Sequence, residues 1–96
     1  MNSVFINTNN GKYYRITVRT EKPGTNIEIA WDNIQNAVAR GTTWVGFSEA
    51  DNFEIKEMMS GVNVSAVTLN VSDISSIELL KEDKKMEKFA FSDTLD

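Results

Sequence analysis

The chain has 96 residues, a hydrophobic fraction of 41% and a formal net charge of −4, which together indicate one small globular domain. It contains no histidine and no cysteine. This excludes disulfides, zinc sites with nitrogen or sulfur ligands, and histidine- or cysteine-based catalysis. The first residues lack the regions of a signal peptide, and no apolar run is long enough to cross a membrane. We therefore expect a cytoplasmic protein.

The charges are unevenly distributed along the chain. All three arginines lie within residues 1–40, whereas eleven of the 14 acidic residues follow residue 40. A phosphate backbone favours a net positive face. The distribution therefore argues against general affinity for nucleic acid, although it leaves room for a local basic patch in the first half.

Residues 1–20 predict a β-hairpin. Two stretches rich in aromatic and β-branched residues, VFIN and YYRITVRT, flank the turn sequence Asn9-Asn10-Gly11. A three-residue loop with Gly11 in the left-handed region pairs Thr8 with Lys12, and it separates apolar from polar side chains better than a two-residue turn does. This register, which we expect, gathers apolar side chains on one face: Val4, Ile6, Tyr14, Ile16 and Val18.

The opposite face of this hairpin combines aromatic residues with arginine. Both are enriched in recognition surfaces, although the outer face of a two-layer domain also carries single exposed apolar groups. We take four residues of this face as candidates for partner binding: Phe5, Tyr13, Arg15 and Arg19.

Residues 26–40 predict an amphipathic helix. Pro23-Gly24 interrupts the preceding strand, Thr25 and Glu28 match the capping-box pattern, and Gly41 suits the C-terminal cap. The buried stripe follows the helical period and consists of Ile27, Ala30, Trp31, Ile34, Ala37 and Val38. We expect Trp31 to lie in the core.

Residues 42–48 predict a strand in which Trp44 lies on the face away from Val45 and Phe47. Trp44 alternates with Gly46, so it needs cover from elsewhere in the chain, from a second subunit or from a partner. We take it as the first candidate for partner binding. Residues 51–60 fit either a strand or a short helix; we favour a strand, which a turn at residues 50–52 would pair with the preceding one.

Two further strands are predicted near residues 65–71 and 76–80, joined by a tight connection from which Ile74 enters the core. Residues 81–96 begin with a charge run and form a C-terminal tail that we expect to be mobile. Phe89 and Phe91 in this tail have no evident place in the core, and we count them among the candidate partner-binding residues.

Together these elements predict a single α+β domain over residues 1–80, in which the helix packs on a mainly antiparallel sheet. The strand order does not follow from the sequence. The five glycines are too scattered for a phosphate-binding loop, and the acids Glu49, Asp51, Glu54 and Glu57 do not match a calcium loop. We expect neither enzymatic activity nor a metal or other cofactor.

The short chain rich in Asn, Lys and Glu, with its NNGK turn and its closing strand pair LNVSDISSIELL, resembles small accessory proteins of phages and mobile elements of Gram-positive bacteria. The resemblance implies a protein that binds and modulates a host protein, for instance as an inhibitor. Self-association into a homodimer is a further alternative. The alternative is a nucleic-acid-binding domain that uses the arginine–aromatic face of the hairpin.

Overall fold

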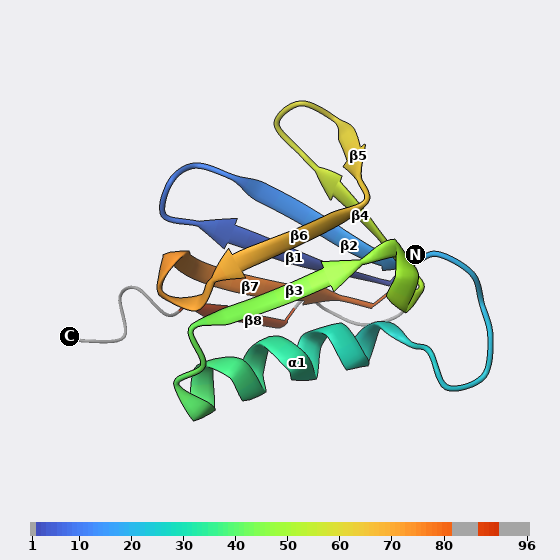
Figure 1. Cartoon of the computed structure of the whole chain (residues 1–96), viewed down its shortest axis with the longest axis horizontal. Coiled ribbons are helices and arrows are strands. Elements are labelled where there is room, and N and C mark those ends of the chain that lie inside the picture. The colour runs from blue at the N-terminus through green and yellow to red at the C-terminus, as the bar shows by residue number, and fades with distance from the viewer. Residues whose placement is uncertain (1, 82–86, 91–96) are drawn as a thin grey trace.

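The computed structural model describes residues 2–81 together with the backbone of residues 87–90. It is an α+β fold with one α-helix, two short 3-10 turns and eight strands (Figure 1). In chain order the elements are β1 (Ser3–Thr8), β2 (Tyr13–Val18), α1 (Ile27–Arg40), β3 (Trp44–Ser48), η1 (Glu49–Asp51), β4 (Phe53–Glu57), β5 (Val62–Val64), β6 (Ala66–Asn70), η2 (Val71–Asp73), β7 (Ile74–Leu80) and β8 (Glu87–Ala90).

The strands form two sheets. The larger sheet has six strands in the order β5-β4-β2-β1-β7-β8, and the smaller is a ribbon of β3 and β6; every pairing is antiparallel. The ribbon and α1 lie side by side over one face of the large sheet (Figure 1). The opposite face of the large sheet carries no further layer among the described residues.

The ribbon arises from a long hairpin that bends onto the sheet. The half next to its turn is β4 paired with β5, and the half farther from the turn is β3 paired with β6. On one side η1 and Asn52, which has a positive φ of 70°, form the bend. On the other side the bend is Ser65 alone, whose carbonyl accepts a hydrogen bond from the Glu49 amide at 2.9 Å. The two halves therefore belong to different layers.

The N-terminal hairpin has the predicted register. Val4 pairs with Ile16 and Ile6 with Tyr14, and the Thr8 amide donates to the Lys12 carbonyl at 3.0 Å. Gly11 has a φ of 86°, the left-handed conformation that the three-residue loop requires. The alternation of apolar residues therefore determined the pairing correctly.

The helix is confirmed over Ile27–Arg40, but the predicted capping box is wrong. The N-cap is Asn26, and it makes no side-chain capping hydrogen bond. Thr25 instead closes a turn with Lys22, in which Pro23 and Gly24 occupy the two central positions. Glu28 pairs with Lys81 at 3.1 Å. At the other end Gly41 has a φ of 69° and is the left-handed C-cap, as predicted.

The core lies between the large sheet and the layer formed by α1 and the ribbon. Trp31 is 6% exposed in the middle of the buried stripe of α1, so its predicted core position is confirmed. Ile74 enters the core as expected, at 2% exposure. The rings of Phe47 and Phe53 meet edge to face, with centroids 5.9 Å apart. This contact joins the ribbon to the large sheet.

Residues 53–57 form strand β4, as favoured, but the hairpin suggested with the preceding strand is wrong. β4 pairs with β2 and β5 and not with β3, because η1 turns the chain out of the plane of the sheet. The strands predicted near residues 65–71 and 76–80 are both present, as β6 and β7; β6 pairs with β3, and β7 pairs with β1.

The backbone of residues 87–90, within the expected tail, forms β8 beside β7, with Phe89 opposite Ile77. Residues 82–86 and 91–96, and with them Phe91, lie outside the described residues. Within the described part of the chain, no helix combines the length and apolar character that membrane crossing requires.

Candidate functional site

The structure divides the predicted binding residues between two surfaces. Trp44 lies on the outer face of the ribbon, where it is 57% exposed. Phe5, Tyr13 and Arg15 lie on the face of the large sheet that points away from α1 and the ribbon. Arg19 belongs to neither group. The two surfaces are on opposite sides of the molecule and are therefore considered separately.

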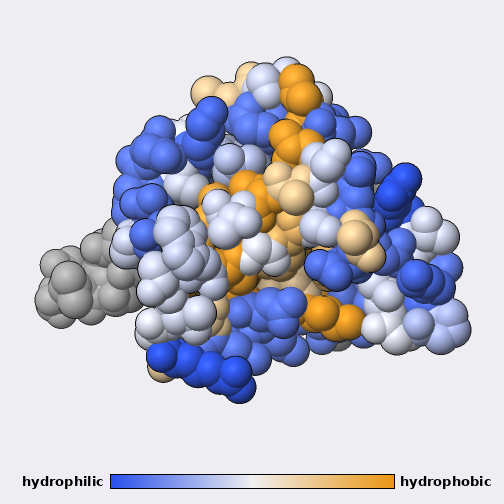
Figure 2. Space-filling model, in the orientation of Figure 1, coloured by the Kyte–Doolittle hydropathy of each residue, from blue (hydrophilic) through white to orange (hydrophobic). Residues whose placement is uncertain are grey.

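A groove runs between α1 and β3, with Trp44 at one end. It consists of two hollows of about 320 and 370 Å³. Both hollows are lined by Asn33 from the helix and Gly46 from the strand. The first hollow extends to Trp44 and Arg40, and the second extends to Ile29 and the turn before the helix. Seen from this side, hydrophobic residues gather in a band across the middle of the face, between hydrophilic flanks (Figure 2).

The backbone of β3 presents unpaired polar groups to this groove. The amide of Val71 donates to the carbonyl of Thr43, and the amide of Glu49 donates to the carbonyl of Ser65. These two bonds flank the pairs Trp44–Asn70 and Ser48–Ala66, which identifies both as non-hydrogen-bonded pairs of the antiparallel ladder. The N–H and C=O groups at positions 44, 46 and 48 therefore point away from β6 and toward α1. Among the described residues no second strand pairs with this edge.

The two ends of the groove differ in charge and share apolar character. Arg40 lies at the Trp44 end and Asp51 at the other end, near Ile29, which is 38% exposed. The buried residues Phe47 and Phe53 also line the second hollow. The groove thus combines an unpaired strand edge with apolar contacts and opposite charges at its ends.

On the opposite side of the molecule, three of the predicted residues form one cluster. Phe5 and Tyr13 stack with ring centroids 5.7 Å apart and an interplanar angle of 21°. The guanidinium carbon of Arg15 lies 6.0 Å from the centroid of the Phe5 ring, and its Nε donates to the Ser3 hydroxyl at 3.1 Å. Cross-strand pairing of β1 with β2 produces this cluster, as the predicted register requires.

Carboxylates accompany the basic groups on this sheet face. Asn7 donates to Ser76 at 3.1 Å and to the Glu78 carboxylate at 3.3 Å. Burial, and then the charge of Glu78, raise the pKa of Tyr13 above its ordinary value. A small hollow of about 160 Å³ beside Arg15 is lined by Lys56 and also by Glu54. The face is therefore mixed in charge.

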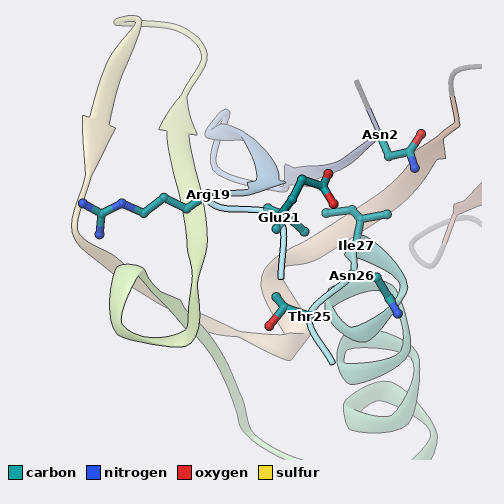
Figure 3. Close-up of a pocket in the computed structure, with 7 residues that line it drawn as sticks. Asn2, Arg19, Glu21, Thr25, Asn26 and Ile27 are labelled. Carbon is teal, nitrogen blue, oxygen red and sulfur yellow. The ribbon is translucent and has the colours of Figure 1, made fainter. Parts of the chain in front are cut away.

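Arg19 lies beyond the end of β2 and does not join the cluster. It lines a hollow of about 380 Å³ at the start of α1, but its side chain extends away from the other labelled residues (Figure 3). The Glu21 carboxylate lies beside Ile27 in the same hollow (Figure 3). A carboxylate at a helix N-terminus already supplies the negative charge that this position favours, so the hollow is poorly suited to an anion.

The acidic residues of the second half do not gather into a cation site. Among residues 2–81, no three acidic side chains come together as metal ligands. Glu57 instead closes the β4–β5 turn, since its carboxylate accepts hydrogen bonds from the Ser60 hydroxyl, the Ser60 amide and the Met59 amide. These bonds, led by that of the Ser60 hydroxyl, lower the pKa of Glu57.

Sequence reasoning identified Trp44 but missed the helix side of the groove. Asn33, Asn36 and Arg40 were not among the predicted binding residues, and they lie off the apolar stripe of α1. Ile29 gave the one available signal, since it is a large apolar residue outside that stripe. The side chain of Phe89 and the whole of Phe91 belong to the part of the chain that the structure does not describe.

Comparison with known protein families, curated proteins and solved structures finds no match for this chain. The functional argument therefore rests on the geometry of the two surfaces.

Proposed function

We propose that the chain is a non-enzymatic protein-binding module and that Trp44, with the adjoining groove, is its contact surface. The role that fits best is that of a cytoplasmic modulator or inhibitor of a host protein, in keeping with the resemblance to accessory proteins of phages and mobile elements. Neither a cofactor nor a metal ion is part of the proposal.

The exposure of Trp44 carries this proposal. Tryptophan is among the residues most enriched in binding hot spots, and here it is 57% exposed on a strand paired with β6, beside a hollow. On the other face of the same strand, Val45 and Phe47 pack into the core and are 8% and 2% exposed. Its position is therefore defined before a partner arrives, which reduces the entropic cost of binding.

Affinity capture from an extract of the native host tests the proposal. The bait is the purified wild-type protein, compared with Trp44→Ala and with Met59→Ala as a matched control. Met59 is a second exposed apolar residue, at 76%, and it lines a different hollow, beside Gly11 and Ser60. We expect a partner that Trp44→Ala loses and Met59→Ala retains. A partner retained equally by all three proteins would contradict the assignment to Trp44.

A second candidate function is nucleic-acid binding through the Phe5–Tyr13–Arg15 cluster. The observation in its favour is that aromatic rings and an arginine share one sheet face, as in stacking platforms for single strands. Against it, Glu78 and Glu54 lie on the same face, and Phe5 and Tyr13 stack on each other. A mobility-shift assay with single-stranded DNA and RNA at low salt distinguishes the two. We expect no shift; a shift abolished by Arg15→Ala would favour the nucleic-acid binder.

A further inference from the structure

We infer that the groove between α1 and β3 takes an extended peptide segment of the partner, which pairs with β3 as a third strand of the ribbon. The inference deepens the proposed function and rests on it, because it specifies the chemical form of the partner at the Trp44 surface.

The edge of β3 offers backbone hydrogen-bonding groups in a repeating pattern. The outward N–H and C=O groups occur at positions 44, 46 and 48, every second residue along an extended strand. Only another extended backbone offers acceptors and donors at that same spacing of about 6.6–6.8 Å. Addition of a strand to an exposed sheet edge is a recurrent mode of peptide recognition. A flat aromatic ligand or a helix would leave most of these groups unpaired.

The helix side of the groove explains why a single segment fits better than a second folded copy of this chain. α1 lines both hollows along their length, so it stands opposite β3 as a second wall. A sheet edge from another copy would bring its neighbouring strands against α1. One extended segment, in contrast, has no neighbouring strand to bring against α1.

Side-chain preferences of the segment follow from the ends of the groove. An apolar residue at each end would contact Trp44 and Ile29, which are 57% and 38% exposed. An acidic group suits the end near Arg40, and a basic group suits the end near Asp51. Gly46 lies between the two ends and lines both hollows. The length of β3, five residues, sets the length of the paired segment.

The test begins with selection of linear nonapeptides from a random displayed library on the folded wild-type protein, with counter-selection on Trp44→Ala. Selected peptides are synthesised and then N-methylated at one backbone nitrogen at a time. Backbone N-methylation removes a hydrogen-bond donor without changing the side chain. We expect an alternating pattern, in which methylation at every second residue weakens binding about tenfold or more and methylation between these residues has little effect.

Amide chemical shifts of the labelled protein locate the peptide. Changes centred on residues 44–48 and on the groove face of α1 support the inference. Changes centred on β6 or on the Phe5–Tyr13 face overturn it. It also fails if binding requires Trp44 but tolerates N-methylation at every position, or if no Trp44-dependent peptide is selected. In both of these cases, a partner still captured through Trp44 would preserve the proposed function and assign it to a folded surface.

Discussion

The two tryptophans provide a matched test of the fold, because one lies in the core and the other on the surface. A fully buried tryptophan removes on the order of 200 Å² from water, worth about 5 kcal/mol at about 25 cal/mol per Å². Trp31 is 6% exposed, and alanine retains part of this burial. We therefore expect Trp31→Ala to lower the free energy of unfolding by about 3–5 kcal/mol. Trp44 is 57% exposed, so Trp44→Ala should cost about 1 kcal/mol.

Urea denaturation followed by far-ultraviolet circular dichroism measures both variants with the same probe. A domain of this size has a stability of about 5–14 kcal/mol, so Trp31→Ala removes a large share of it. With an m-value of about 1.5 kcal/mol per M, a loss of about 4 kcal/mol lowers the urea midpoint by about 2–3 M. Trp31→Phe, which keeps much of the volume, should lose less. A loss below about 1 kcal/mol for Trp31→Ala, or equal losses for the two alanine variants, would refute the assignment of Trp31 to the core.

Three other predictions concern the cap, the β4–β5 turn and the oligomeric state. Thr25→Ala should change the free energy of unfolding by less than about 0.5 kcal/mol, because Asn26 is the N-cap; a loss near 1 kcal/mol in urea denaturation would restore the capping box. The pKa of Glu57 is lowered by its bonds to Ser60 and Met59. Its contribution to stability should therefore be complete above the ordinary glutamate pKa of about 4.3 and be lost as the pH falls through the lowered pKa. Urea midpoints between pH 7 and 3 should consequently fall less steeply for Glu57→Gln than for the wild type, and parallel curves would contradict this. Light scattering up to high micromolar concentration should give the mass of a monomer, as a heterologous partner implies; a dimer mass that Trp44→Ala abolishes would identify the partner as a second copy.

Local patterns predicted the elements that neighbouring residues determine. The hairpin register followed from the alternation around Gly11, and the buried face of α1 followed from the spacing of Ile27, Trp31 and Ile34. The N-cap was misassigned for a local reason too, since the Pro23-Gly24 turn uses Thr25 before the helix begins. The turn sequence and the capping-box pattern both include Thr25, and in the structure Thr25 belongs to the turn.

The pairing of the second half could not be predicted, because it depends on contacts between distant residues. Ser48 and Phe53 are separated by one short turn, yet their strands belong to different sheets. The left-handed Asn52 and the 3-10 turn before it make the bend, but neither pattern specifies that the chain leaves the sheet. The position of Trp44 on the outer face was predictable from alternation alone. The groove beside it was not, because it requires α1 and β3 to lie next to each other.

The bend at η1 and Asn52, which could not be predicted from the sequence, also explains how this small domain combines a core with an unpaired strand edge. Once β3 and β6 leave the large sheet, their inner side chains, among them Phe47 and Leu69, cover its apolar face at 2% and 8% exposure. Because of this bend, β6 is the only strand that pairs with β3 among the described residues. An unpaired edge is usually kept short or protected because it favours association with other chains. Here α1 lies beside the edge and partly covers it. The proposed partner follows from the same arrangement, because α1 would obstruct the neighbouring strands of a folded sheet at β3, whereas a single extended segment has no such strands.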